Sequence, residues 1–256
     1  MAVSNKRLVR ESFGRAAATY DAAAVVQRRV CARLLEELTW ENEPPARVLD
    51  AGCGTGFGAE RLRARWPGAR LVGVDFAPAM LAAARRALDD GVAADMEQLP
   101  FGPARFDLWW SSLSIQWCDA AAVFAEAARV LAPGGRLAFS TLCPETFAEL
   151  RAAFAGVDPH RHTLPFSAPE ALDRALEDAG LHARRLIRER HTVFYPNLKA
   201  LLVSIKDIGA HHVGGGARPG LMGRAAWARV EAAYERFRAP SGLPASYDVL
   251  LGYAVR

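Results

Sequence analysis

The hydrophobic and polar positions of the chain fall into two alternating patterns. Short apolar runs predict buried strands at 48–50, 70–75, 91–95, 106–111 and 136–140. Between them, longer stretches with helical spacing predict helices at 59–65, 78–88 and 120–131. Strands that alternate with helices are typical of a parallel sheet covered by helices on both faces. The pattern therefore predicts an α/β fold with a doubly wound, mostly parallel sheet.

The regular alternation is interrupted after Thr141. The pattern there predicts helices at 145–154, 167–180, 198–208 and 224–237, and strands at 184–195 and 247–255. Ser167 and Glu170 have the spacing of a capping box, which would open the second of these helices. The stretch 198–243 is thus expected to be a helical insertion before the last strand of a seven-stranded sheet. Its glycine-rich part, 211–220, is expected to be a mobile loop.

The segment before the first strand predicts helices over 5–38, with a break near Tyr20. These helices either pack on the core as an amphipathic pair or close over a ligand as a lid. A length of 256 residues fits one domain. We expect N-terminal lid helices (1–43), a cofactor-binding core (44–142) and substrate-side elements with the remaining strands (143–256).

The turn after the first strand is rich in glycine. Glycines stand at alternate positions behind Asp50, namely Gly52, Gly54, Gly56 and Gly58. Glycine allows a sharp turn and a close approach of a ligand to bare backbone, and the following helix offers N–H groups that are not bonded within it. This arrangement predicts a ligand site at the tip of the strand.

The acids near the strand ends indicate which ligand binds there. The glycines satisfy the dinucleotide fingerprint, but Asp50 would repel a pyrophosphate and suits a cation. The loop therefore fits a positively charged nucleoside cofactor without phosphate, such as S-adenosylmethionine. Asp75 ends the second strand and can accept both ribose hydroxyls, and Asp95 ends the third. The alternative is that Asp75 and Asp95 only cap helices.

Composition narrows the class of protein. No apolar stretch approaches the ~18 residues of a membrane span, and the N-terminal residues do not form a secretory signal. The four cysteines are too scattered for a disulfide framework or a zinc site. We expect a cytoplasmic protein that binds no metal, no nucleic acid and no membrane. The stretch 181–224 carries eight cations and two anions, so it is either a solvated face or a docking surface for an acidic partner.

The stretch from Asp50 to Gly56 resembles motif I of class I S-adenosylmethionine-dependent methyltransferases, which have a Rossmann-like fold. That resemblance implies S-adenosylmethionine as cofactor and S-adenosylhomocysteine as product. Asp75 and Asp95 match the ribose and adenine acids of that class. The cofactor-binding residues that we expect are Asp50, Gly52, Cys53, Gly54, Gly56, Asp75, Phe76, Asp95, Met96 and Ser111.

Several further stretches resemble the malonyl-acyl-carrier-protein O-methyltransferase family, the entry enzymes of biotin synthesis. They include 12–21, Gln27, 97–101, 115–118, 139–142, 206–210 and 242–247. The resemblance implies methyl transfer to the free carboxylate of a malonyl thioester on acyl carrier protein. It also implies Tyr20 as a catalytic residue and substrate contacts from Arg15, Gln27, Trp117 and Lys206.

The chemistry of the acceptor agrees with this resemblance, although alternatives stay open. A carboxylate is already ionised at pH 7, so it needs positioning and desolvation but no general base, and no candidate base stands near the strand ends. The alternatives are a methyltransferase for another small carboxylic acid or a quinone precursor, and a cofactor-binding or RNA-associated module. The group that holds the malonyl carboxylate, and carrier protein versus coenzyme A as its carrier, also stay open.

Overall fold

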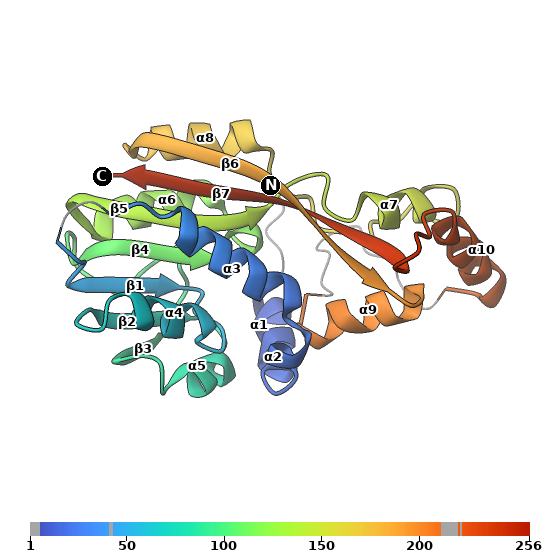
Figure 1. Cartoon of the computed structure of the whole chain (residues 1–256), viewed down its shortest axis with the longest axis horizontal. Coiled ribbons are helices and arrows are strands. Elements are labelled where there is room, and N and C mark those ends of the chain that lie inside the picture. The colour runs from blue at the N-terminus through green and yellow to red at the C-terminus, as the bar shows by residue number, and fades with distance from the viewer. Residues whose placement is uncertain (1–5, 41–42, 211–219, 221) are drawn as a thin grey trace.

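A computed structural model describes residues 6–40, 43–210, 220 and 222–256. Among them, seven strands form one sheet in the order β3-β2-β1-β4-β5-β7-β6, in which β7 is antiparallel to both neighbours (Figure 1). The strands are β1 (Arg47–Ala51), β2 (Arg70–Asp75), β3 (Asp90–Ala93), β4 (Phe106–Ser112), β5 (Leu131–Leu142), β6 (His182–Tyr195) and β7 (Leu243–Val255). The predicted mostly parallel, seven-stranded sheet is confirmed.

Helices cover both faces of this sheet, as a doubly wound fold requires. One core lies under α3 and α4, and a second core lies under α6 and α8. The described helices are α1 (Lys6–Ala16), α2 (Tyr20–Ala23), α3 (Val25–Glu37), α4 (Phe57–Arg65), α5 (Pro78–Ala84), the short 3₁₀ helix η1 (Ile115–Trp117), α6 (Ala120–Val130), α7 (Ala148–Ala155), α8 (Pro169–Asp178), α9 (Leu198–Asp207) and α10 (Arg224–Glu235).

The two C-terminal strands, β6 and β7, extend beyond the rest of the sheet. Helices α7, α9 and α10 gather around their far end (Figure 1). α9 and α10 belong to the predicted insertion before the last strand, which is confirmed. The predicted mobile loop at 211–220 lies, apart from Gly220, outside the described residues.

Some element boundaries differ from the sequence prediction. The prediction of a capping box at Ser167 is wrong. The N-cap of α8 is Ala168, which makes no side-chain cap hydrogen bond, and Pro169, whose φ is fixed by its ring, opens the first turn. β5 begins at Leu131 instead of Arg136, because a bulge opposite β4 carries the strand through the Pro-Gly-Gly stretch. Neither difference moves the strand ends that form the site.

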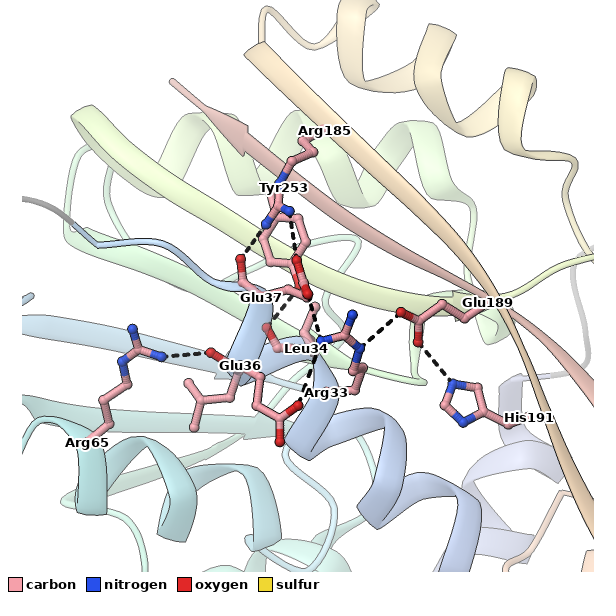
Figure 2. A network of polar contacts seen from close by, with 10 residues as sticks. Arg33, Leu34, Glu36, Glu37, Arg65, Arg185, Glu189, His191 and Tyr253 are labelled. Carbon is pink, nitrogen blue, oxygen red and sulfur yellow. Dashed lines mark hydrogen bonds and ion pairs between the residues drawn. The ribbon is translucent and has the colours of Figure 1, made fainter.

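Helix α3 is fixed to the edge of the sheet by a polar network (Figure 2). Arg33 of α3 pairs with Glu189 of β6 at 3.0 Å, and Arg185 of β6 donates to Glu37 of α3 at 2.8 Å. The hydroxyl of Tyr253 on β7 donates to the Leu34 carbonyl at 2.9 Å. α3 also buries Val26, Val30, Cys31 and Leu34 in the core, whereas α1 and α2 lie over the strand ends.

No helix among the described residues combines the length and apolar character that a membrane crossing demands.

Candidate active site

A first cavity, here called the strand-end cavity, lies where β1, β2 and β4 end, and α1 to α3 form its outer wall. The glycine-rich loop after β1 forms its floor. The N–H groups of Gly52 and Cys53 both donate to the Val74 carbonyl, which ties the loop to β2. Gly52 has φ +75°, and a Cβ there would lie 2.4 Å from the Ser114 hydroxyl oxygen. Only glycine fits this close approach of the β1 and β4 loops.

Asp50 is buried at the end of β1. Its Oδ2 has no hydrogen-bond partner among the described residues, and neither has the indole nitrogen of Trp110. Both atoms are close to Gly58, since a Cβ there would lie 3.1 Å from Oδ2 and 3.2 Å from Nε1. Burial, with a smaller contribution from the charge of Asp75, raises the pKa of Asp50 to about 7. A buried carboxylate at the wall of the cavity fits a cationic ligand, which would stabilise its ionised form.

Asp75 is buried at the end of β2 and faces the same cavity. Its Oδ2 accepts from the Gly54 N–H at 3.0 Å, and its Oδ1 accepts from the Ala77 N–H at 2.8 Å. These bonds favour the ionised carboxylate, but burial outweighs them and raises its pKa to about 6. Two backbone hydrogen bonds therefore fix the orientation of this carboxylate at the wall of the cavity.

The outer end of this cavity is closed by Lys6 of α1. Its ammonium lies 2.5 Å from Asp95 and 2.7 Å from Glu97, in the loop after β3. Asp95, Glu97 and Cys118 are near enough to one another to suggest a metal site. The ammonium already compensates the two carboxylates, so this cluster fits a lysine clamp better than a metal ion. The clamp joins the first helix to the loop that carries the predicted adenine acid.

A second cavity, here called the outer cavity, lies between the N-terminal helices and the elements around the far end of β7. Its walls come from α1, α2, α3, η1, α7, α9 and the loop before α8. Five residues line both cavities and define what we call the junction, namely Phe13, Tyr20, Gln27, Leu113 and Trp117. The ring of Phe13 packs edge-on against Trp117, with centroids 5.3 Å apart. The strand-end cavity and the outer cavity thus meet at the junction, which is lined by aromatic side chains, one leucine and one amide.

Most of the residues predicted for the site lie in these cavities. The strand-end cavity is lined by Asp50, Gly52, Cys53, Gly54, Asp75, Phe76, Asp95 and Met96. Tyr20, Gln27 and Trp117 lie at the junction, and Lys206 lines the outer cavity.

Three predicted residues do not line either cavity. Gly56 is the N-cap of α4 with φ +94°, so it shapes the turn from behind. Ser111 is fully buried inside the sheet, paired with Phe139 of β5. Arg15 is exposed on α1 and donates to Ser12 at 3.2 Å. Their sequence positions next to site residues did not reveal which way each side chain faces.

Sequence reasoning missed the Lys6 clamp and gave no site role to Leu113 and Gln116. Lys6 is 89 residues away from Asp95, so no motif spacing could connect them. Leu113 has the left-handed φ of +51°, which only the structure reveals. Gln116 lies in the stretch 115–118, which resembles the O-methyltransferase family, and this resemblance was the signal in the sequence that could have indicated a role for it.

Comparisons with known proteins agree with this geometry. The family model described as "Methyltransferase domain" matches residues 49–139, which include most of β1, all of β2, β3 and β4, and most of β5. A malonyl-acyl-carrier-protein O-methyltransferase from Dechloromonas aromatica is 46% identical over 250 residues, which cover 98% of this chain and 94% of that protein. The chain belongs to the malonyl-acyl-carrier-protein O-methyltransferase family.

Two further matches place this family member in a wider context. A biotin biosynthesis bifunctional protein from Cellvibrio japonicus is 41% identical, and the match covers 96% of this chain and 49% of that protein. The crystal structure of a geranyl diphosphate C-methyltransferase from Streptomyces coelicolor has a TM-score of 0.53 and 19% identity, with 88% and 78% of the two chains covered. The second match reflects the shared methyltransferase fold.

Membership of this family makes S-adenosylmethionine the cofactor, and the strand-end cavity fits it. The buried Asp50 carboxylate suits positive charge, and Asp75 suits the ribose hydroxyls.

Proposed function

We propose that the protein transfers a methyl group from S-adenosylmethionine to the free carboxylate of a malonyl thioester on acyl carrier protein, an early step of biotin synthesis. The observation that carries this proposal is the junction. The strand-end cavity suits a cationic nucleoside. It meets the largely apolar outer cavity at the junction, where Tyr20, Gln27 and Trp117 line both. When bound, the cofactor supplies an electrophilic methyl group, and an acceptor in the outer cavity would reach it at this point.

The junction suits an acceptor that is already ionised. Its side chains are neutral, and burial raises the pKa of Tyr20 above its usual range, with smaller contributions from Asp75 and Asp21. The Tyr20 hydroxyl therefore stays protonated and can donate a hydrogen bond but cannot act as a base. A carboxylate needs no base, whereas a phenol or a carbon acid would. Tyr20 is thus proposed to orient the acceptor at the junction.

The N-terminal helices α1 and α2 are proposed to act as a lid. Three contacts hold them over both cavities: Lys6 on the loop after β3, Asp21 with the Thr55 hydroxyl at 2.8 Å, and Thr19 with the Asp207 carbonyl at 2.9 Å. All three contacts are polar, and those of Asp21 and Thr19 are exposed to solvent. Such contacts can break and reform when ligands enter, whereas α3 is anchored by the apolar residues that it buries in the core, Val26, Val30, Cys31 and Leu34.

Docking of an acidic carrier protein is proposed on the exposed cations around α9 and α10. Of the cations predicted for this role on β6, Arg184, Arg185 and Arg188 form ion pairs with Asp173, Glu37 and Asp248. Those three thus have partners within the chain. Arg218 lies outside the described residues. The exposed Arg190, Lys199, Lys206 and Arg224 remain as the docking candidates, and Lys206 also lines the outer cavity. They would bring the prosthetic arm to the mouth of that cavity.

The charge reversals Lys199→Glu and Arg224→Glu test the docking proposal. Each should raise KM for malonyl carrier protein about threefold and leave KM for a short malonyl thioester unchanged, because only the carrier protein is acidic. Steady-state assays at low and high salt check this. Arg105→Glu, at an exposed position just before β4 and away from α9 and α10, is the control for net charge. A KM for malonyl carrier protein that stays at the wild-type value in both variants would place the docking surface elsewhere.

The activity itself is tested with labelled S-adenosylmethionine and parallel acceptors: malonyl carrier protein, malonyl-coenzyme A, a small tricarboxylic acid and a quinone precursor. We expect the malonyl thioesters to be methylated and the carrier-bound form to be preferred. Methylation of the quinone precursor or the small acid alone would overturn the proposal. Cofactor binding without turnover on any acceptor would favour a binding module instead.

A further inference from the structure

The end of β4 makes an unusual turn at the junction. Leu113 is a non-glycine residue with φ +51°, in the left-handed region that costs energy for a branched side chain. Its N–H donates to the Ser140 carbonyl and hydroxyl oxygens of β5, both at 3.0 Å, which holds the turn against the sheet. Its side chain lines both cavities. The strained turn therefore places the Leu113 carbonyl at the boundary between the two chambers.

That carbonyl fixes the side-chain amide of Gln116. The Nε2 of Gln116 donates to the Leu113 carbonyl at 2.6 Å, and its Oε1 accepts from the Thr141 hydroxyl at 3.3 Å. A carbonyl can only accept, so the nitrogen must face Leu113 and the orientation of the amide is defined. An amide nitrogen carries two N–H groups, and one of those on Gln116 has no partner among the described residues. Gln116 lines the outer cavity immediately beside the junction.

We propose that this second N–H of Gln116 binds the acceptor carboxylate, donating to the oxygen that does not attack the methyl group. The inference rests on the proposed function and names the group that holds the malonyl carboxylate. Thr141 is the positioning residue, because it holds the other end of the same amide.

A neutral donor has a physical advantage at this place. A lysine or arginine would bind the carboxylate more strongly, but it would also withdraw negative charge from the attacking oxygen. The positive charge of the cofactor already attracts the carboxylate, so the protein has only to orient it. An amide N–H fixed at both ends does this and leaves the nucleophile anionic. The exposed cation of the outer cavity, Lys206, is then left for the far end of the acceptor.

The experiment compares two acceptors that differ by one group. One is malonyl-pantetheine, and the other is its carboxyethyl thioether, in which a methylene replaces the thioester carbonyl. Gln116→Met keeps the length and loses the donor, so kcat/KM should fall about 10- to 100-fold for both acceptors, the usual range for a hydrogen bond to a charged group. In Gln116→Glu, kcat/KM should fall at least as far, because the new carboxylate places a like charge beside the acceptor carboxylate. The affinity for S-adenosylmethionine should stay within about twofold of the wild type.

Three matched variants distinguish a role of Gln116 in binding the acceptor from a purely structural role. Gln98→Met makes the same change at an exposed site outside both cavities and should leave kinetics unchanged. Thr141→Val should lower kcat/KM about threefold by releasing the amide, and Thr141→Ser should restore it. A loss for the thioester alone would mean that Gln116 contacts the carbonyl, which overturns the proposal. No loss for either acceptor, or a parallel loss of cofactor affinity, would overturn it as well. Failure of the wild-type protein on both acceptors would instead refute the proposed function.

Discussion

The strand-end cavity and the outer cavity are built in different ways. The floor of the strand-end cavity comes from one continuous part of the chain, Asp50 to Cys118, in which β1, β2, β3 and β4 end side by side. The outer cavity gathers segments from Phe13 to Tyr247, and most of its walls come from helices and loops that lie far apart in the chain. The first is rich in carboxylates and glycine, and the second is largely apolar. A cofactor site made of strand ends can be read from local motifs, whereas an acceptor site made of distant segments depends on how these pack.

The largest effect that tests this difference between the two cavities is expected from removing Asp75, an acid at the end of β2. Asp75→Ala should lower S-adenosylmethionine affinity by about 30-fold or more, roughly 2 kcal/mol, because charge-assisted hydrogen bonds to the ribose are lost. Calorimetry checks this, with Asp173→Ala on α8, outside both cavities, as the control. Unchanged affinity in a folded Asp75→Ala protein would remove Asp75 from the cofactor site.

A change at the junction should affect turnover and spare cofactor binding. Tyr20→Phe should lower kcat about 10- to 30-fold and change cofactor affinity little, because its hydroxyl orients the acceptor. Tyr234→Phe is the matched control, since the Tyr234 hydroxyl donates to the Pro244 carbonyl at 2.7 Å, outside both cavities. If Tyr20→Phe turns over as fast as the wild type, Tyr20 only packs against its neighbours.

The buried charge of Asp50 predicts a pH dependence confined to the strand-end cavity. Its pKa of about 7 in the free protein means that the carboxyl is largely protonated at pH 6. A cationic cofactor favours the ionised form, so binding releases a proton, and affinity should rise about tenfold between pH 6 and pH 8. Calorimetry in two buffers of different ionisation enthalpy measures the proton release. Asp50→Asn should bind more weakly and lose this pH dependence; a dependence that survives in it would assign the proton to another group.

The smallest expected effect concerns the contact between the lid and α9. Gly209 has φ +73°, and a Cβ there would lie 3.1 Å from the backbone of Ser12 and Phe13 in α1. Gly180 has the same φ with nothing within 4 Å, so it controls for backbone strain. Gly209→Ala and Gly180→Ala should lose similar stability, about 1 kcal/mol each. Gly209→Ala alone should slow turnover, about fivefold, and equal turnover in the two variants would argue against a coupled lid.

The amino-acid sequence by itself determined the sheet and most of the cofactor site. Continuous apolar runs specify buried strands, and the right-handed crossovers bring their carboxyl ends to one edge. Asp50, Asp75 and Asp95 stand at or just beyond such ends, so their meeting followed from the chain order. The glycine loop is equally local, because its turn depends on backbone freedom within a few residues.

Only the tertiary structure decided which side chains of distant elements meet. Lys6 clamps Asp95, the Gln116 amide accepts from Thr141 of β5, and Arg185 and Arg188 of β6 pair with acids of other elements. All of these contacts join segments that lie far apart in the chain. The direction of Ser111 and Arg15 was likewise set by packing. Such contacts leave no periodicity or spacing in the sequence, because side-chain pairing between distant elements depends on register, helix rotation and burial together.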